Sequence, residues 1–553
     1  MDYVETRNYL TTRVAELDAI WEKMAPRYRE IQLYMNPDAG VNLSGYNSED
    51  YYGTGVGYDE ILDPTPLEVI RVCAAGIQSG TTSPARPWFV LQAEDPIANR
   101  NPQFKNFLFE FTERMRTLFA RTNVYHGFYH TYKELATFDT GAVALFEHLR
   151  KGLHARPFTC GEYRLALNSD LEIDTFLYKA FFSARQLVEK FGKENCSNVV
   201  LQAYDTKKPE SLFKVCWLVE PNDGRLKEKD FMNRKFRAIY FEQESTEDKI
   251  LDISGFDSFP VMAPRWDIIA GRVYGSGIGA QAVPNSKGLQ RIKESSLIAL
   301  DKQVEPPLTG PTNLSPYEIN SMPNGYTPAD DMSGRGLRAV YENKVNLADV
   351  RLEIEDARMQ MRRGHFNDLF MMLMNISDTT MRTKEEIVKR HEEKLIMLGP
   401  FIERQHTELL NPFISRAAQI MIELGMAPKV PKGFEKAAIQ IVHISILAQA
   451  QKMIGSAGMN EWLSFVGNLS AVFPEAKYKV SPFAAIDRYA DMTGVAPDVV
   501  VPNEIAAAAF QDDLKKQQAA QQGAAMAQGV ESAKLLSETD INKDSALKAL
   551  IGR

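Results

Sequence analysis

Two glycine clusters are the part of this sequence whose spacing most resembles a chemical motif. Residues 53–57 read GTGVG, and a second cluster fits the G-x-G-x-x-A pattern of dinucleotide loops with Gly275, Gly277 and Ala280. Such a loop follows a buried strand and opens a helix that binds pyrophosphate. Here Pro284 follows at once and no long apolar strand precedes the cluster. Tight turns or flexible loops are therefore favoured, and a dinucleotide-binding enzyme is the weaker alternative.

The histidines and cysteines do not form a recognisable site. His126 and His130 are four residues apart and could face one metal ion, but the Glu of a zinc-protease motif is missing and aromatic neighbours favour a packed helix face. The four cysteines are scattered and form no C-x-x-C pair, which excludes a zinc ribbon and a disulfide framework. The sequence has neither a P-loop nor a G-x-S-x-G motif. We predict no enzyme activity, no cofactor and no metal.

Composition narrows the class of protein further. Of the 553 residues 44% are hydrophobic and 25% charged, so most of the chain can bury a core. The net charge is -8, whereas proteins that grip nucleic acid over a broad surface are usually basic. The first residues show no pattern of a signal peptide, and we expect none; no run of roughly 18–20 apolar residues occurs. We expect a soluble chain that is made in the cytoplasm.

The elements that would position any site are mostly helices. Residues 10–31 carry an apolar stripe that Pro26 interrupts, which predicts a kink or a second helix opened by Pro26. Thr65-Pro66-Leu67-Glu68 fits a capping box that begins another helix. Residues 102–138, which are rich in Phe, Leu and Tyr, predict two more helices. An α+β region with one helix near 184–192 follows, and its β-prone runs are 143–146, 163–166, 213–218 and 238–242.

Two long helices are the clearest feature of the second half. The first runs from about Asn285 to Val304, and the second from about Leu347 to Asn375. Residues 305–346 between them are rich in Pro, Gly, Asn and Ser and hold one strand-like run. At about 100° per residue, a cationic stripe forms on the first helix; its members are Lys287, Arg291 and Lys302.

At this point the chain resembles a known family, the portal (head-to-tail connector) proteins of short-tailed bacteriophages, or podoviruses. The most specific stretch is Leu62–Val90, a helix followed by S-P-A-R-P-W-F. Further similarity lies in Pro264-Arg265-Trp266, in Leu300–Pro307 and in Arg390–Leu395 with the Leu-Gly-Pro that follows. These matches occur in the family's order over residues 1–430. They are more specific than either glycine cluster.

The resemblance implies an α+β, mainly helical portal fold with wing, stem, clip and crown. The expected parts are the α+β wing (1–283), the first stem helix (284–304), the clip (305–346), the second stem helix (347–375), a tunnel loop (376–383), wing and crown helices (384–430), the crown (431–504) and a low-complexity tail (505–553).

The resemblance also implies a function. Such portals form rings of twelve at one capsid vertex of the virion, conduct double-stranded DNA during packaging and ejection, and dock the terminase large subunit and later the tail adaptor. Other implied partners are the major capsid and scaffolding proteins, with assembly in the host cytoplasm. A scaffolding protein itself would be shorter and more charged.

The residues predicted to serve this function fall into two sets. The DNA-channel candidates are Lys287, Arg291, Lys302, Arg382 and Lys384. Ion pairs between subunits, with Glu294 or Glu355, are the alternative role for these cations. The clip docking candidates are Tyr317, Tyr326, Arg335 and Arg338.

Overall fold

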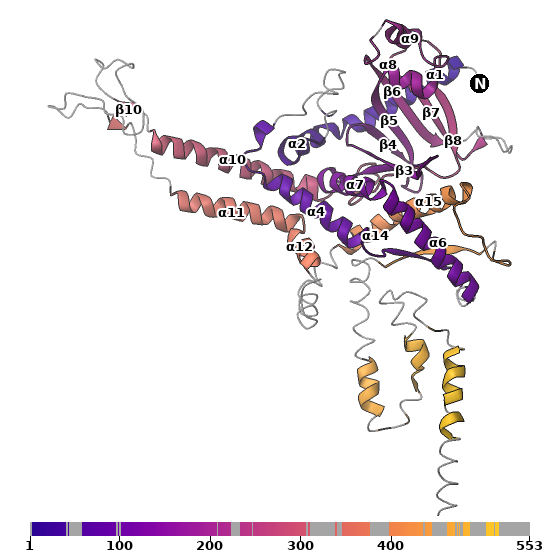
Figure 1. The fold of residues 1–553 in the computed structure, drawn as a ribbon. Helices are drawn as coiled ribbons and strands as arrows, with labels where there is room; N and C mark the ends of the chain where they lie inside the picture. The colour runs from indigo at the N-terminus through magenta and orange to yellow at the C-terminus, as the bar shows by residue number, and fades with distance from the viewer. Residues whose placement is uncertain are drawn as a thin grey trace, which may run out of the picture. The chain divides into compact units, whose positions relative to one another are not determined.

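The computed structural model describes most of the chain up to residue 444. The described residues are 3–39, 43, 58–95, 98, 101–206, 208–222, 233–245, 247–305, 308–309, 338–339, 346–375, 398–434 and 437–444, with shorter pieces between 462 and 518. The chain divides into two compact units, Met1–Ile454 and Gly455–Arg553. The first is a mixture of helices and strands, as the sequence predicts (Figure 1).

The amino-terminal helices follow the predicted break at Pro26. Helix α1 spans Tyr3–Glu22 and α2 spans Ala25–Met35, with the proline in its first turn. After the 3₁₀ turn Tyr58–Glu60 comes α4, Thr65–Thr81, and then strand β1, Phe89–Ala93.

The predicted capping box of α4 is wrong. No side chain of the N-cap residue bonds the helix, because Thr65 is already helical and its hydroxyl and N–H both donate to Asp63.

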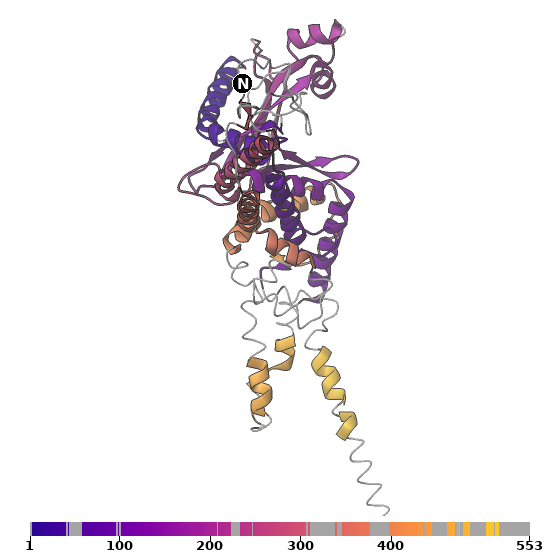
Figure 2. The ribbon, with the colours of Figure 1, turned by 90° about the vertical axis from the view of Figure 1, so that its left-hand side faces the viewer.

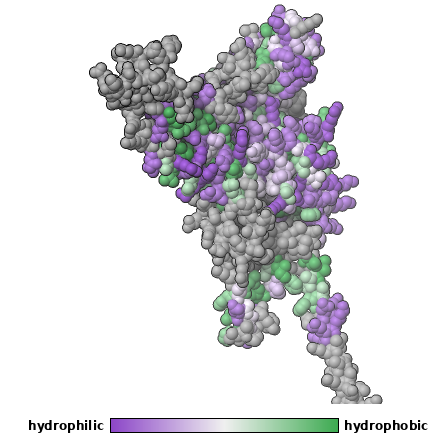
Figure 3. Space-filling view, turned by 60° about the vertical axis from the view of Figure 1, so that its left-hand side comes forward, coloured by the Kyte–Doolittle hydropathy of each residue, from purple (hydrophilic) through white to green (hydrophobic). Residues whose placement is uncertain are grey.

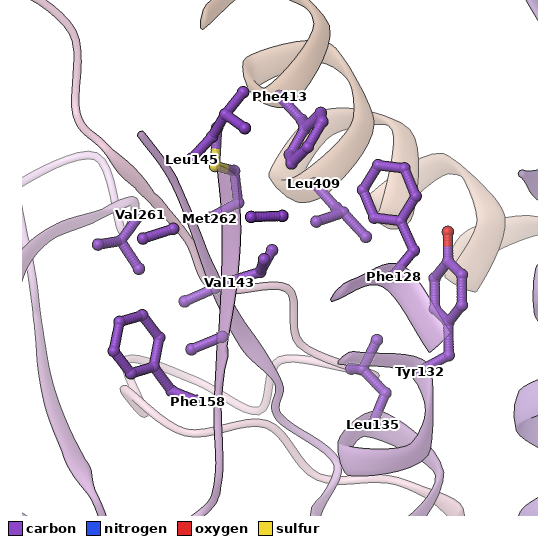
Figure 4. Packing of buried hydrophobic residues seen from close by; sticks show 14 of the residues in the cluster. Phe128, Tyr132, Leu135, Val143, Leu145, Phe158, Val261, Met262, Leu409 and Phe413 are labelled. Atoms are coloured by element: carbon purple, nitrogen blue, oxygen red, sulfur yellow. The ribbon is translucent and has the colours of Figure 1, made fainter. Parts of the chain in front are cut away.

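The core lies where α7 packs on a three-stranded antiparallel sheet. Helix α6 spans Pro102–Arg121 and α7 spans Val124–Phe138. The sheet has the order β3-β2-β9, with strands Gly152–Phe158, Ala142–His148 and Val261–Met262. Figure 4 shows side chains of α7, such as Phe128 and Leu135, turned toward Val143 of β2 and toward Phe413 of a later helix.

A five-stranded antiparallel sheet forms the rest of the predicted α+β region. Its order follows the chain, with β4 (Tyr163–Leu167), β5 (Ile173–Ser183), β6 (Leu212–Pro221), β7 (Phe236–Glu242) and β8 (Asp252–Phe256). Helices α8 (Ala184–Phe191) and α9 (Asn198–Asp205) connect β5 to β6. The four β-prone runs are confirmed as strands, whereas β3, β5, β8 and α9 were not predicted.

The two long helices are present, with different limits. Helix α10 spans Ile278–Val304 and thus begins before Pro284, which it holds inside. Helix α11 spans Leu347–Gly364, and α12, Asn367–Asn375, is separate because Phe366 takes the left-handed conformation with φ 55°. Helices α10 and α11 contact each other and run antiparallel (Figure 1), and Figure 2 views them nearly end-on.

Short elements complete the first unit. Strands β10 (Leu308–Thr309) and β11 (Arg338–Ala339) pair antiparallel and join the two ends of the insertion between α10 and α11. Helix α14 (Gly399–Gln405), a π-helical turn (His406–Leu410) and α15 (Asn411–Glu423) follow one another. Strand β12, Ile439–His443, pairs with β1.

Candidate functional site

The candidate site is the pair of helices α10 and α11 together with the residues that fix them to the rest of the unit. One side of α11 is packed, because Ile354 and Met361 are buried and Val350 and Ala357 pack beside them. Helix α10 also contacts α2 and α7, and α11 contacts α4. The hairpin's base is therefore held by three other helices.

The amino terminus of α10 receives the carboxylate of Asp139. The N–H of Gly279 donates to Oδ1 at 2.9 Å, the N–H of Ala280 to Oδ2 at 3.3 Å, and Arg27 lies 3.6 Å from Oδ2. Asp139 ends α7 in the left-handed conformation, with φ 62°. A carboxylate at this place satisfies N–H groups that a helix leaves unpaired and complements the helix dipole.

This contact explains the second glycine cluster without a nucleotide. A Cβ on Gly279 would collide with the carbonyl oxygen of Thr137, and one on Gly275 with that of Asp139. On Gly277 it would lie 2.5 Å from the ring of Trp266. The cluster does open a helix, but the N–H groups that a pyrophosphate would use are bonded to the protein's own carboxylate. The dinucleotide alternative is thereby wrong for this loop.

Asp139 is buried and yet ionises near neutral pH. Burial raises its pKa to about 6, while the N–H of Gly279 and the charge of Arg27 limit the rise. At pH 7 the carboxylate is therefore mostly charged, the form that the helix dipole favours.

Asp63 is the second anchor, and it joins three helices. Its carboxylate accepts two hydrogen bonds from Arg358 of α11, at 3.0 Å from Nε and 2.6 Å from Nη2. It also accepts the N–H and hydroxyl of Thr65 at the start of α4. On the α10 side, the amide of Gln290 accepts the N–H of Asp63 at 2.8 Å and donates to its carbonyl at 3.1 Å.

The electrostatics of Asp63 differ from those of Asp139. Burial would raise its pKa, but the hydrogen bonds from Arg358 and Thr65 outweigh burial and hold the pKa below its ordinary value. Arg358 also pairs with Glu355 within α11, at 2.7 Å. Arg358 therefore forms one ion pair within α11 and a second with Asp63 in the loop before α4.

The five DNA-channel candidates differ in their surroundings. The Nζ of Lys287 lies 3.0 Å from Glu30 of α2, so its charge is used within the chain. Arg291 and Lys302 are exposed on α10 and form no ion pair with any residue that the structure describes. Arg382 and Lys384 lie outside the described residues.

Most of the clip docking candidates also fall in the part of the chain that the structure does not describe. Tyr317, Tyr326 and Arg335 lie outside the described residues, and Arg338 is the first residue of β11, opposite Thr309.

The histidines and cysteines that the sequence analysis considered lie in different surroundings. His126 is exposed on α7, and burial lowers the pKa of its neighbour His130 to about 4. Within the described ranges no group of three His, Cys, Asp or Glu side chains could hold a metal ion. All four cysteines are buried free thiols. No described helix has the length and apolar character needed to cross a membrane.

Sequence reasoning missed the two aspartates on which the hairpin depends. Asp63 could have been suspected, since an acid directly before a Pro-Thr-Pro helix start is a frequent acceptor for unpaired N–H groups. Asp139 gave no local signal, because its partners lie about 140 residues later in the chain.

Comparison with known proteins decides the family. Residues 7–500 match the family described as "Bacteriophage head to tail connecting protein". The chain belongs to this family. It is 35% identical over 548 residues to the portal protein of Salmonella phage epsilon15, and 32% identical over 544 residues to the probable portal protein of Bordetella phage BPP-1. Each alignment covers 98% of this chain and 97% of the relative. The resemblance recognised in the sequence is confirmed, and the chain is a head-tail connector.

Among solved structures, a chain from the neck of an empty GTA particle, computed with C6 symmetry, is similar at a TM-score of 0.29 and 9% identity. The match covers 55% of this chain and 65% of that one, slightly less than two thirds. A similarity this weak carries no argument about function.

We predict that Asp63→Asn lowers the free energy of unfolding by about 2 kcal/mol at pH 7, because Arg358 loses a charged acceptor. Asp63's folded pKa is lowered, so its contribution is present above the unfolded pKa near 3.9 and is lost as the pH falls through the folded value. The difference between variant and wild type should therefore narrow below about pH 4. Denaturant unfolding at pH 7 and pH 3 measures both effects.

The matched control is Glu68→Gln, which removes the acid of the exposed pair that α4 forms with Arg362. This change should cost less than about 0.5 kcal/mol. Equal losses in the two variants would show that the buried anchor has no special weight.

Proposed function

We propose that this connector is the portal protein of a short-tailed phage. Twelve copies would form a ring at one vertex of the capsid, assembled in the host cytoplasm together with the major capsid and scaffolding proteins. The ring would conduct double-stranded DNA inward during packaging and outward during ejection. The proposal rests on two alignments that cover nearly the full length of this chain. They match it to a portal protein at 35% identity and to a probable portal protein at 32% identity, and the connector family model matches as well.

The parts of the subunit follow from the same proposal. Helices α10 and α11 would be the stem, and residues 305–346 the clip, which docks the terminase motor and later the tail adaptor. The antiparallel hairpin and the strand pair at the base of the insertion support this division. Residues 376–383 would be the tunnel loop, with wing elements before α10 and crown elements after residue 384.

The charge of the ring suits passage rather than capture. A net charge of -8 becomes about -96 over twelve copies, which disfavours a tight grip on phosphates. A conduit needs only a few cations on its inner wall. Of the five candidates we assign this role to Arg382 and Lys384, since Lys287 is paired with Glu30 and since Arg291 and Lys302 are assigned below to contacts between neighbouring copies.

Electron microscopy of the purified chain tests the function directly. We expect closed rings with an axial opening. Monomers or dimers that form no rings would refute the proposal.

The channel assignment is tested by Arg382→Ala combined with Lys384→Ala in assembling phage. We expect less DNA per head and a shallower salt dependence of DNA binding by isolated rings, because phosphate contacts are lost. Lys287→Ala is the matched control and should change neither quantity. Unchanged packaging in the double variant would remove the two residues from the channel.

For the clip, deletion of residues 314–336 should leave rings intact and abolish their binding to the terminase large subunit, measured by cosedimentation. The milder pair Tyr317→Ala and Tyr326→Ala should weaken the same binding without shortening the chain. Undiminished binding by both variants would place the docking surface elsewhere.

A further inference from the structure

The α10–α11 hairpin leaves an apolar edge uncovered on each of its helices. In the outer half of α10, half-buried positions recur every three or four residues and mark the side that α11 covers; they are Ile292, Ser296, Ala299 and Gln303. Lys293, beside Ile292, is half-buried as well. Leu297 and Ile298 each lie about 130° around the helix from that side. Their side chains are 42% and 46% exposed.

Helix α11 has a corresponding edge. Leu352 lies about 170° around the helix from its packed side, on which Ile354 and Met361 are buried. It is 69% exposed. Figure 3 turns the side from which the hairpin projects in Figure 1 toward the viewer. Its coloured surface shows hydrophobic residues next to hydrophilic ones.

The two edges lie at the same level of the hairpin. Gln290 and Arg358 both reach Asp63, which sets these positions level. Leu297 is seven residues farther out on α10, and Leu352 is six residues farther out on α11, which is about 10 and 9 Å at the helical rise. In a ring whose axis runs along the hairpin, each copy is related to the next by a rotation about that axis. Such a rotation does not shift the residues along the axis. Leu352 of one copy thus comes opposite Leu297 and Ile298 of the next.

The charges beside these edges are complementary. Arg291 of α10 and Asp356 of α11 are exposed, and neither forms an ion pair with a described residue. Both lie within two residues of the level of Asp63. Because α11 of a neighbour is antiparallel to α10, the two side chains fall on the same side of the Leu352 contact. Lys302 and Asp349 form a similar combination nearer the tip.

We infer that neighbouring copies associate through these edges: Leu352 of one copy packs between Leu297 and Ile298 of the next, with Arg291 paired to Asp356 beside it. The inference rests on the proposed ring. A closed ring requires two different surfaces that fit each other, and the hairpin supplies one on each helix. Arg291 and Lys302 are therefore contacts between subunits and not channel cations.

Cysteine cross-linking tests the packing. Ile298→Cys combined with Leu352→Cys, oxidised by air with a copper catalyst, should give a ladder of covalent oligomers on denaturing gels. The native cysteines are buried, which keeps the background low. Each single variant, and Ser295→Cys combined with Leu352→Cys, should give little ladder. A ladder no stronger than in these controls would overturn the inferred packing.

Charge reversal tests the ion pair. Arg291→Glu and Asp356→Arg should each weaken ring association at least about threefold, and the double variant should restore it. Lys293→Glu, the same charge change on another side of α10, should leave association unchanged. Single variants with normal rings, or a double variant no better than the singles, would overturn the pairing. If the wild-type chain forms no rings at all, the proposed function itself fails and this interface fails with it.

Discussion

One buried carboxylate sets the direction in which the longest helix leaves the protein. Asp139 ends α7 and begins α10, because its oxygens accept the first free N–H groups of that helix while Arg27 of α2 lies beside them. A close joint is the result, since Gly275 and Gly279 let the backbone at the start of α10 approach the end of α7 more closely than any side chain would allow. The hairpin and its contacts depend on this joint for their position. Asp63 then fixes the second helix of the hairpin to the first.

Local patterns predicted the elements that have local causes. The helix break at Pro26, the helices of residues 102–138 and four of the strands follow from apolar periodicity and proline geometry. The start of α10 was placed too late, because Pro284 suggests a beginning and the preceding glycines resemble a loop. Distant partners overrode both signals. Strand β5 was missed because its buried centre, residues 175–181, includes Lys179 and so shows neither alternation nor an uninterrupted apolar run.

In the candidate site, too, features with local causes could be predicted and features set by distant partners could not. Cations at a helical spacing can be found in a sequence, but the partners that use their charge cannot. Lys287 and Arg291 occupy one stripe, yet among the described residues an acid of another helix pairs with Lys287 and none with Arg291. Likewise Gly275, Gly277 and Ala280 match a nucleotide motif. A nucleotide-binding loop and the start of α10 both need backbone N–H groups turned toward an anion. The motif identifies that need, and only the fold shows that the anion is an aspartate of the chain itself.

The strand pair β10–β11 bears on how such a protein can change over evolution. Leu308–Thr309 and Arg338–Ala339 bring the two ends of the insertion together just beyond the hairpin. Substitutions or changes of length between these strands leave the spacing of α10 and α11 untouched. If the insertion docks the motor and the adaptor as proposed, a lineage could exchange these partners without redesigning the two helices. Under the proposed function, the sequence that meets the partners is separated from the helices of the hairpin by two paired residues on each side.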